Sequence, residues 1–189
     1  GIQGPTGPEG TSALLRPKPG TMIEPGQASG GGTWPTGSYT TARLFGPFLP
    51  GWSIDRVGID ILTGQANSSV KLCVWEPNAY GHPGTLLWVS PASVVTTTSN
   101  TLVLDTPVSP IPVTTTHILI GACSTGASPP NARFSSLSDA ERRFFGTSAA
   151  SSTSNAYSLW GAGTPVSDKV MSIVAGAGHS NYKLVVRAA

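Results

Sequence analysis

Histidines, carboxylates and cysteines are the side chains with which this chain could do acid–base, nucleophilic or metal chemistry. His82, His117 and His179 lie far apart, and no stretch resembles a phosphate-cradling loop, a zinc-binding helix or a calcium loop. The stretch 178–182 begins like the turn that carries a hydrolase serine, but it lacks the closing glycine of that motif. It is more typical of a hairpin turn before a final strand. We therefore predict a protein that is not an enzyme and that holds no metal and no cofactor.

The carboxylates leave one enzymatic alternative open. A glycosidase needs two carboxyl groups held about 5–10 Å apart in a cleft, and Asp139 or Glu141 could meet another carboxylate across the fold. No local motif supports such a pair, so a polysaccharide depolymerase is only an alternative. Cys73 and Cys123 lie in apolar runs and are typical of small buried thiols, although a disulfide between them stays open.

Aromatic and amide side chains in predicted loops point to binding rather than catalysis. Flat rings stack on the apolar faces of sugars, while amide, hydroxyl and imidazole groups bond the sugar hydroxyls. Loop aromatics also close the ends of β-sandwiches, which is the structural alternative for each of them. Arg133 would suit an acidic sugar. The candidate ligand-binding residues are Asn78, Tyr80, His82, Arg133, Asn155, Tyr157 and Trp160, with Trp34 as a further loop aromatic.

The elements that must position these side chains read as β-strands throughout. Segments rich in valine, isoleucine, threonine and aromatic residues alternate with glycine, proline, asparagine and serine clusters, and only 138–145 suggests a short helix. The chain is predicted to be all-β, an antiparallel two-sheet sandwich of jelly-roll type, with its head domain at 39–189. Expected strands are 39–48, 52–62, 69–76, 85–95, 101–104, 117–123, 142–147, 169–174 and 182–187.

Alternation along these segments predicts which side chains fill the core. Every second residue of 57–61 is apolar, and the same period of two recurs in the next segment. The expected core residues are Val57, Ile59, Ile61, Leu72, Val74, Leu102, Ile118, Ile120, Leu184 and Val186.

The composition limits the kinds of partner. Charged residues make up 11% of the chain and the net charge is +2 without charge runs, so neither nucleic acid nor membrane insertion is expected. No apolar stretch reaches the ~20 residues that cross a bilayer.

The first residues carry the register of collagen. Gly1, Gly4, Gly7 and Gly10 recur every third residue, and proline follows two of them. Only glycine fits at the axis where three polyproline-II chains wind together, so residues 1–10 predict a stalk end and a homotrimer, and a flexible linker is the alternative. Residues 11–38 would form a neck, whose apolar clusters either pack around the threefold axis or lie on the domain of their own chain.

One block resembles a module found at the C-terminal ends of bacteriophage tail fibre and minor tail proteins. The residues that carry the likeness are the stretch from Ser53 to Asp60, the strand from Val70 to Asn78, and the turn from Tyr80 to Leu87 with its Pro-Gly-Thr-Leu-Leu. The likeness covers about 39–189. It implies a receptor-binding fibre tip in the virion that binds a host surface glycan and joins upstream fibre proteins. A structural head fibre or capsid decoration without a ligand is the alternative.

Overall fold

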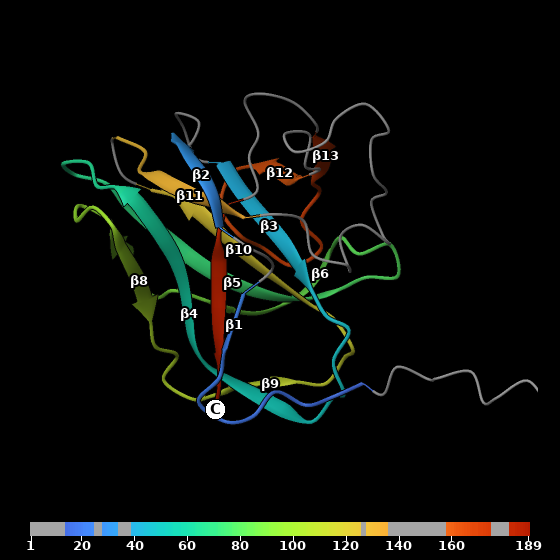
Figure 1. Cartoon of the computed structure of the whole chain (residues 1–189). Coiled ribbons are helices and arrows are strands. Elements are labelled where there is room, and N and C mark those ends of the chain that lie inside the picture. The colour runs from blue at the N-terminus through green and yellow to red at the C-terminus, as the bar shows by residue number, and fades with distance from the viewer. Residues whose placement is uncertain (1–13, 25–27, 34–38, 126–127, 136–157, 175–181) are drawn as a thin grey trace, which may run out of the picture.

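Two antiparallel β-sheets pack face to face in the computed structural model of this protein (Figure 1). The structure describes residues 14–24, 28–33, 39–125, 128–135, 158–174 and 182–189. The predicted all-β, two-sheet antiparallel sandwich is confirmed. Among the described residues, no helix is long and apolar enough to cross a membrane.

Sheet A is built around the long strand β4. Its hydrogen-bonded order is β1-β14-β4-β11-β2. β14 and β11 pair with successive parts of one edge of β4, and β9 and β8 pair with the opposite edge. Its strands are β1 (Met22–Ile23), β2 (Ala28–Thr33), β4 (Trp52–Thr63), β8 (Thr101–Asp105), β9 (Ile111–Val113), β11 (Asn131–Ser135) and β14 (Leu184–Ala188).

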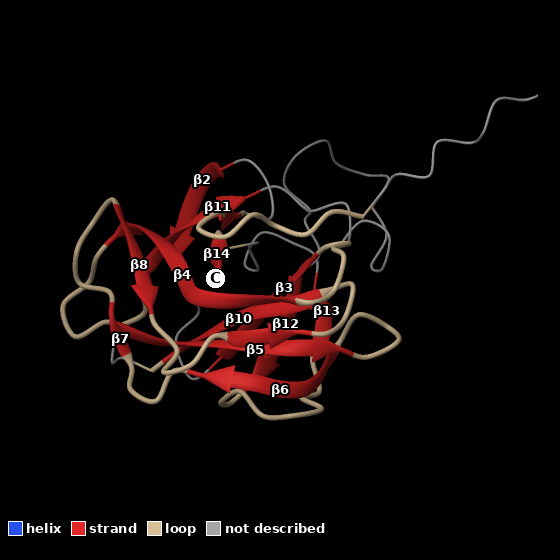
Figure 2. Ribbon diagram, turned by 90° about the horizontal axis from the view of Figure 1, so that it is seen from below, coloured by secondary structure: helices blue, strands red, loops and turns tan. Residues whose placement is uncertain are grey.

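Sheet B has β10 at its centre and lies across the core from sheet A (Figure 2). Its order is β13-β12-β3-β10-β5-β6, with β7 pairing with β5. Successive strands repeatedly change sheet, because β3, β5 and β10 belong to sheet B whereas β4, β9 and β11 belong to sheet A. The strands of sheet B are β3 (Tyr39–Phe45), β5 (Ser69–Pro77), β6 (Pro83–Val89), β7 (Val94–Val95), β10 (Ile118–Ser124), β12 (Ser158–Ala162) and β13 (Ser172–Val174).

The space between the sheets holds the main core. Of the predicted core residues, all but one are fully buried there, as the alternation along β4, β5, β10 and β14 indicated. Leu102 is the exception, because it is 39% exposed on β8. It pairs with Asp60 of β4, whereas the neighbouring Val103 pairs with the buried Ile59 and packs against the core. The prediction for Leu102 is therefore wrong.

A second apolar cluster covers the outer face of sheet B. Trp75 is fully buried in this cluster, and its indole Nε1 donates a hydrogen bond of 2.8 Å to the carbonyl oxygen of Val166. The loop between β12 and β13 therefore lies over the outer face of sheet B. Every residue of β10 is buried because both faces of this strand are covered. The cluster consists of Ala42, Leu44, Cys73, Trp75, Leu119, Leu159 and Met171.

Both cysteines belong to this doubly covered sheet and are free thiols. Cys73 pairs with Gly121 and Cys123 pairs with Lys71, so the two cysteines are diagonal neighbours on adjacent strands. Diagonal Cα atoms lie about 7–8 Å apart, which exceeds the usual Cα separation across a disulfide. Burial raises the pKa of both thiols. These features fit the small buried thiols that the sequence predicted.

Part of the expected neck lies on the domain of its own chain. Met22 and Ile23 form β1 and pair with β14, and Ile23 packs against the main core. Residues 28–33 form β2, which pairs with β11. Of the two alternatives for the apolar cluster Met22/Ile23, the structure shows this one. The glycine tract, the suggested helix at 138–145 and the expected strand at 142–147 lie outside the described residues.

Candidate functional site

The turn between β5 and β6 holds three of the predicted ligand-binding residues. The Oδ1 atom of Asn78 accepts hydrogen bonds from the backbone N–H groups of Tyr80, at 2.9 Å, and His82, at 3.1 Å. The N–H of Asn78 donates to the carbonyl oxygen of His82 at 2.8 Å, and Gly81 adopts a positive φ of 76°. An asparagine side chain that bonds the backbone two residues on is a standard way to fix a turn. Asn78 therefore shapes the loop, and Tyr80 is left 78% exposed.

A second segment, Asp168–Met171, lies alongside this turn and is tied to β6. The N–H of Asp168 donates to the carbonyl oxygen of Gly84 at 2.8 Å, and the N–H of Leu86 donates to Oγ of Ser167 at 3.0 Å. Asp168 has a φ of 49°, in the left-handed region that aspartate tolerates better than most residues. Met171 anchors the segment in the outer cluster, because it is buried there.

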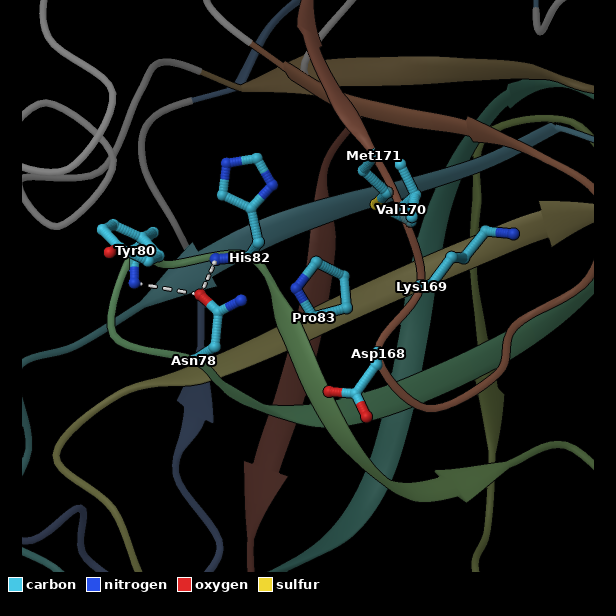
Figure 3. A pocket seen from close by; sticks show the side chains of 8 residues that line it. All are labelled: Asn78, Tyr80, His82, Pro83, Asp168, Lys169, Val170 and Met171. Atoms are coloured by element: carbon cyan, nitrogen blue, oxygen red, sulfur yellow. Dashed lines mark hydrogen bonds between the residues drawn. The ribbon is translucent and has the colours of Figure 1, made fainter.

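The Lys169 side chain links the same segment to the residues that precede it. Its side chain is buried, and Nζ donates hydrogen bonds of 2.9 Å to the carbonyl oxygens of Ala162 and Thr164. The ammonium group therefore bonds the end of β12 and the loop after it. In Figure 3 the Lys169 side chain extends away from the Asn78–His82 turn.

We predict that Lys169→Met destabilises the protein. Removing the ammonium removes two part-buried hydrogen bonds from a charged donor, which costs about 1–3 kcal/mol of the free energy of unfolding. Urea unfolding measures the loss. Lys18→Met is the control, because Lys18 is exposed and its replacement is expected to change the midpoint little. Equal midpoints for the two variants would contradict the bonding of Lys169 described here.

Together the two segments enclose an open hollow of about 350 Å³ (Figure 3). The hollow combines apolar surface with a few polar groups, which are the Asn78 amide, the His82 imidazole and the Asp168 carboxylate. A flat apolar ligand face bordered by hydroxyl groups would suit this surface. The lining residues are Asn78, Tyr80, His82, Pro83, Asp168, Lys169, Val170 and Met171.

Arg133 lies elsewhere, on β11 of sheet A. Its Nε is 3.2 Å from Oδ1 of Asp60, and its Nη2 donates to Oδ1 of Asn100 at 2.9 Å. Lys183 contacts the same carboxylate, with Nζ 3.4 Å from Oδ2 of Asp60, and also lies 3.2 Å from Oε1 of Glu24. Arg133 does not line the hollow. Its guanidinium group contacts Asp60 and Asn100 instead. The expected role of Arg133 toward an acidic sugar is not supported at this site.

The other predicted site residues are described in part or not at all. Trp160 belongs to β12, where it pairs with Thr41 and Ser172, so its expected position in a loop is wrong. Asn155, Tyr157 and Trp34 lie outside the described residues.

Sequence reasoning missed the second wall of the hollow. The residues from Lys169 onward read as a strand in the sequence, yet β13 begins at Ser172. The turn-forming residues between Gly163 and Asp168 mark a loop. Nothing in their spacing indicates that this loop packs beside the distant Asn78 turn, where it is held by hydrogen bonds to Trp75 and to Gly84.

The site contains no grouping of the kind that binds metal. Among the described residues, no three histidine, cysteine, aspartate or glutamate side chains come together as metal ligands. The fold and the hollow thus define an all-β sandwich protein with a surface depression suited to polar, partly apolar ligands. No protein-family model matches the chain, and comparisons with curated proteins and with solved structures found no significant match.

Proposed function

We propose that this protein is a non-enzymatic fibre tip that binds a cell-surface glycan in the hollow between the Asn78 turn and the Asp168 segment. The observation that carries the proposal is the lining of the hollow, with the exposed Tyr80 ring and the Asn78 amide on the turn and the Asp168 carboxylate on the facing segment (Figure 3). An aromatic ring next to amide and carboxylate groups is the combination that binds a sugar by its apolar face and its hydroxyls.

The charges around the hollow favour a glycan without acidic groups. Lys169 directs its ammonium to backbone carbonyls, and Asp168 contributes a carboxylate that is exposed. An acidic sugar would bring its own carboxylate near Asp168 without this ammonium to compensate it. A neutral or amino sugar instead offers hydroxyl or ammonium donors to the same carboxylate.

Binding is proposed rather than cleavage because the hollow has one carboxyl group. Glycoside hydrolysis needs a pair of carboxyl groups about 5–10 Å apart, and Asp168 is the single acidic residue among the described residues that line the hollow. A depolymerase would therefore have to assemble its second carboxylate from elsewhere.

The glycine tract supports a homotrimer in this proposal. Three copies of a weak sugar site gain about 10²–10⁴ in avidity when they bind one surface together. The likeness to phage tail fibre modules suggests the virion as the location, on the tail or alternatively on the capsid surface, with upstream fibre proteins as partners. Light scattering of the full chain tests the assembly, because a trimer has three times the chain mass of 19.3 kDa.

We predict that Tyr80→Ala/Asp168→Asn weakens glycan binding by at least about tenfold, because it removes the stacking ring and the charged acceptor. Glycan-array binding measures the effect, with neutral, amino and acidic oligosaccharides as the probes. Wild-type protein is expected to bind neutral or amino sugars in preference to acidic ones.

The matched control is Leu104→Ala/Asp105→Asn on β8 of sheet A, which removes one exposed apolar side chain and one carboxylate away from the hollow. It is expected to bind like the wild type. Wild-type protein that binds no glycan would favour the structural head-fibre or decoration role. Release of reducing ends from a bound polysaccharide would favour the depolymerase.

A further inference from the structure

Three exposed leucines lie together where the described chain begins. Leu15 is 74% exposed, Leu49 is 42% exposed and Leu14 is 38% exposed. The N–H of Leu49 donates to the carbonyl oxygen of Leu15 at 3.2 Å, so the two segments run side by side although they are far apart in the sequence. We refer to Leu14, Leu15 and Leu49 as the leucine patch.

The patch is held in place by its neighbours. Nε of Arg16 donates a hydrogen bond of 2.8 Å to the carbonyl oxygen of Pro50, and the Arg16 guanidinium lies over Gly51, where an added Cβ would be 3.0 Å from Nη2. These contacts fix residues 15–16 against the loop between β3 and β4, at the lower right of the sandwich in Figure 1. The leucine side chains are therefore presented to solvent by an ordered backbone.

The position of the glycine tract determines what can cover this patch. In the proposed trimer, glycine at every third position up to Gly10 would place three chains around one axis. Leu14 is four residues along the chain from Gly10, and a fully extended chain covers at most about 14 Å in four steps. Each copy of Leu14 must then lie within about 14 Å of the end of that axis. The proposed trimer would therefore bring the three leucine patches close to one axis.

We infer that the leucine patches of three copies of this chain pack against one another at the base of the stalk and join the three sandwich domains. The inference rests on the proposed trimer and names the surface that forms it. Three adjacent leucines that are solvent-exposed in one chain are buried when the copies meet.

The first test compares the mass of full-length variants in solution. Leu15→Ser/Leu49→Ser is expected to lower the mass by light scattering from three chains to one at micromolar concentration, while its urea unfolding midpoint stays close to that of the wild type. Val95→Ser is the control, because Val95 is 63% exposed on β7 of sheet B and lies outside the patch. It is expected to remain a trimer.

The second test places a thiol in the patch. The two native thiols are buried, so Leu15→Cys adds the one accessible thiol among the described residues. Mild oxidation is expected to link two of three chains on a non-reducing gel, whereas Val95→Cys stays unlinked.

The outcomes separate the inference from the function proposed above. A wild-type chain that is monomeric would overturn both the trimer and the inference. A trimeric wild type whose serine variant also stays trimeric, or whose Leu15→Cys variant does not form linked chains, would overturn the inference alone. Glycan binding per chain is expected to be unchanged in the serine variant, because the hollow is formed by other residues.

Discussion

Gly121→Val is expected to prevent stable folding. Gly121 lies at the middle of β10 on the face that meets the outer cluster, and an added Cβ would lie 2.5 Å from Cζ3 of Trp75 and 2.6 Å from the carbonyl oxygen of Thr41. Real Cβ atoms do not approach so closely, and neither neighbour can move easily. Trp75 is fully buried and bonded to Val166, and Thr41 belongs to the adjacent strand β3. Overpacking a well-packed core typically costs about 1–3 kcal/mol and sometimes more, and valine adds two further methyl groups.

Urea unfolding of Gly121→Ala and Gly121→Val measures this expectation. Gly84→Ala is the matched control within sheet B, since its added Cβ would have the carbonyl oxygen of Glu76 as its nearest contact at 3.0 Å. We expect the control to lose much less stability than Gly121→Ala. A folded Gly121→Val with a midpoint near that of the wild type would mean that Trp75 is not packed over β10 as described.

The same glycine shows where the sequence was informative and where it was not. The alternating pattern of Ile118 and Ile120 with their neighbours predicted a strand and its core-facing residues correctly. The alternation did not predict that Leu119 is buried on the opposite face, although the expected burial of the Cys123 thiol already pointed to that face. Their burial depends on the segment that follows β12, which is brought over sheet B by tertiary packing. Alternation of apolar and polar residues indicates that one face of a strand is buried. It does not indicate whether another segment covers the opposite face.

The candidate site was predictable to a similar degree. An asparagine, a tyrosine and a glycine between two apolar runs are typical of a loop with exposed aromatic and amide groups, and this pattern indicated the Asn78 turn. No comparable pattern indicates Asp168, because it comes from a distant segment of the chain that is held beside the turn by tertiary hydrogen bonds such as the one from its N–H to the carbonyl oxygen of Gly84. The sequence places Arg133 in a loop, yet it lies in β11 and is paired with Asp60.

The prediction for Leu102 is wrong for a reason that is visible in β8. The sequence Thr-Leu-Val-Leu-Asp offers two phases, because either the leucines or the valine can face the core. The register with β4 selects the valine, since Val103 pairs with the inward-facing Ile59 and Leu104 pairs with Gly58. In a short strand the sequence leaves open which side chains face the core. Pairing with a longer strand whose inward-facing residues are clear from its alternation decides this.

Leu72→Ala is expected to lower the free energy of unfolding by about 2–5 kcal/mol, the range for large-to-small changes in a core. Leu72 is fully buried on β5 between the two sheets, so its removal leaves a cavity that closely packed neighbours cannot fill. Leu102→Ala makes the same chemical change on a side chain that is 39% exposed, and we expect it to cost about 1 kcal/mol or less, because water already contacts much of that side chain. Urea denaturation of both variants under identical conditions gives the comparison. Similar losses at the two positions would show that β8 presents Leu102 to the core after all, which would reverse the register between β8 and β4.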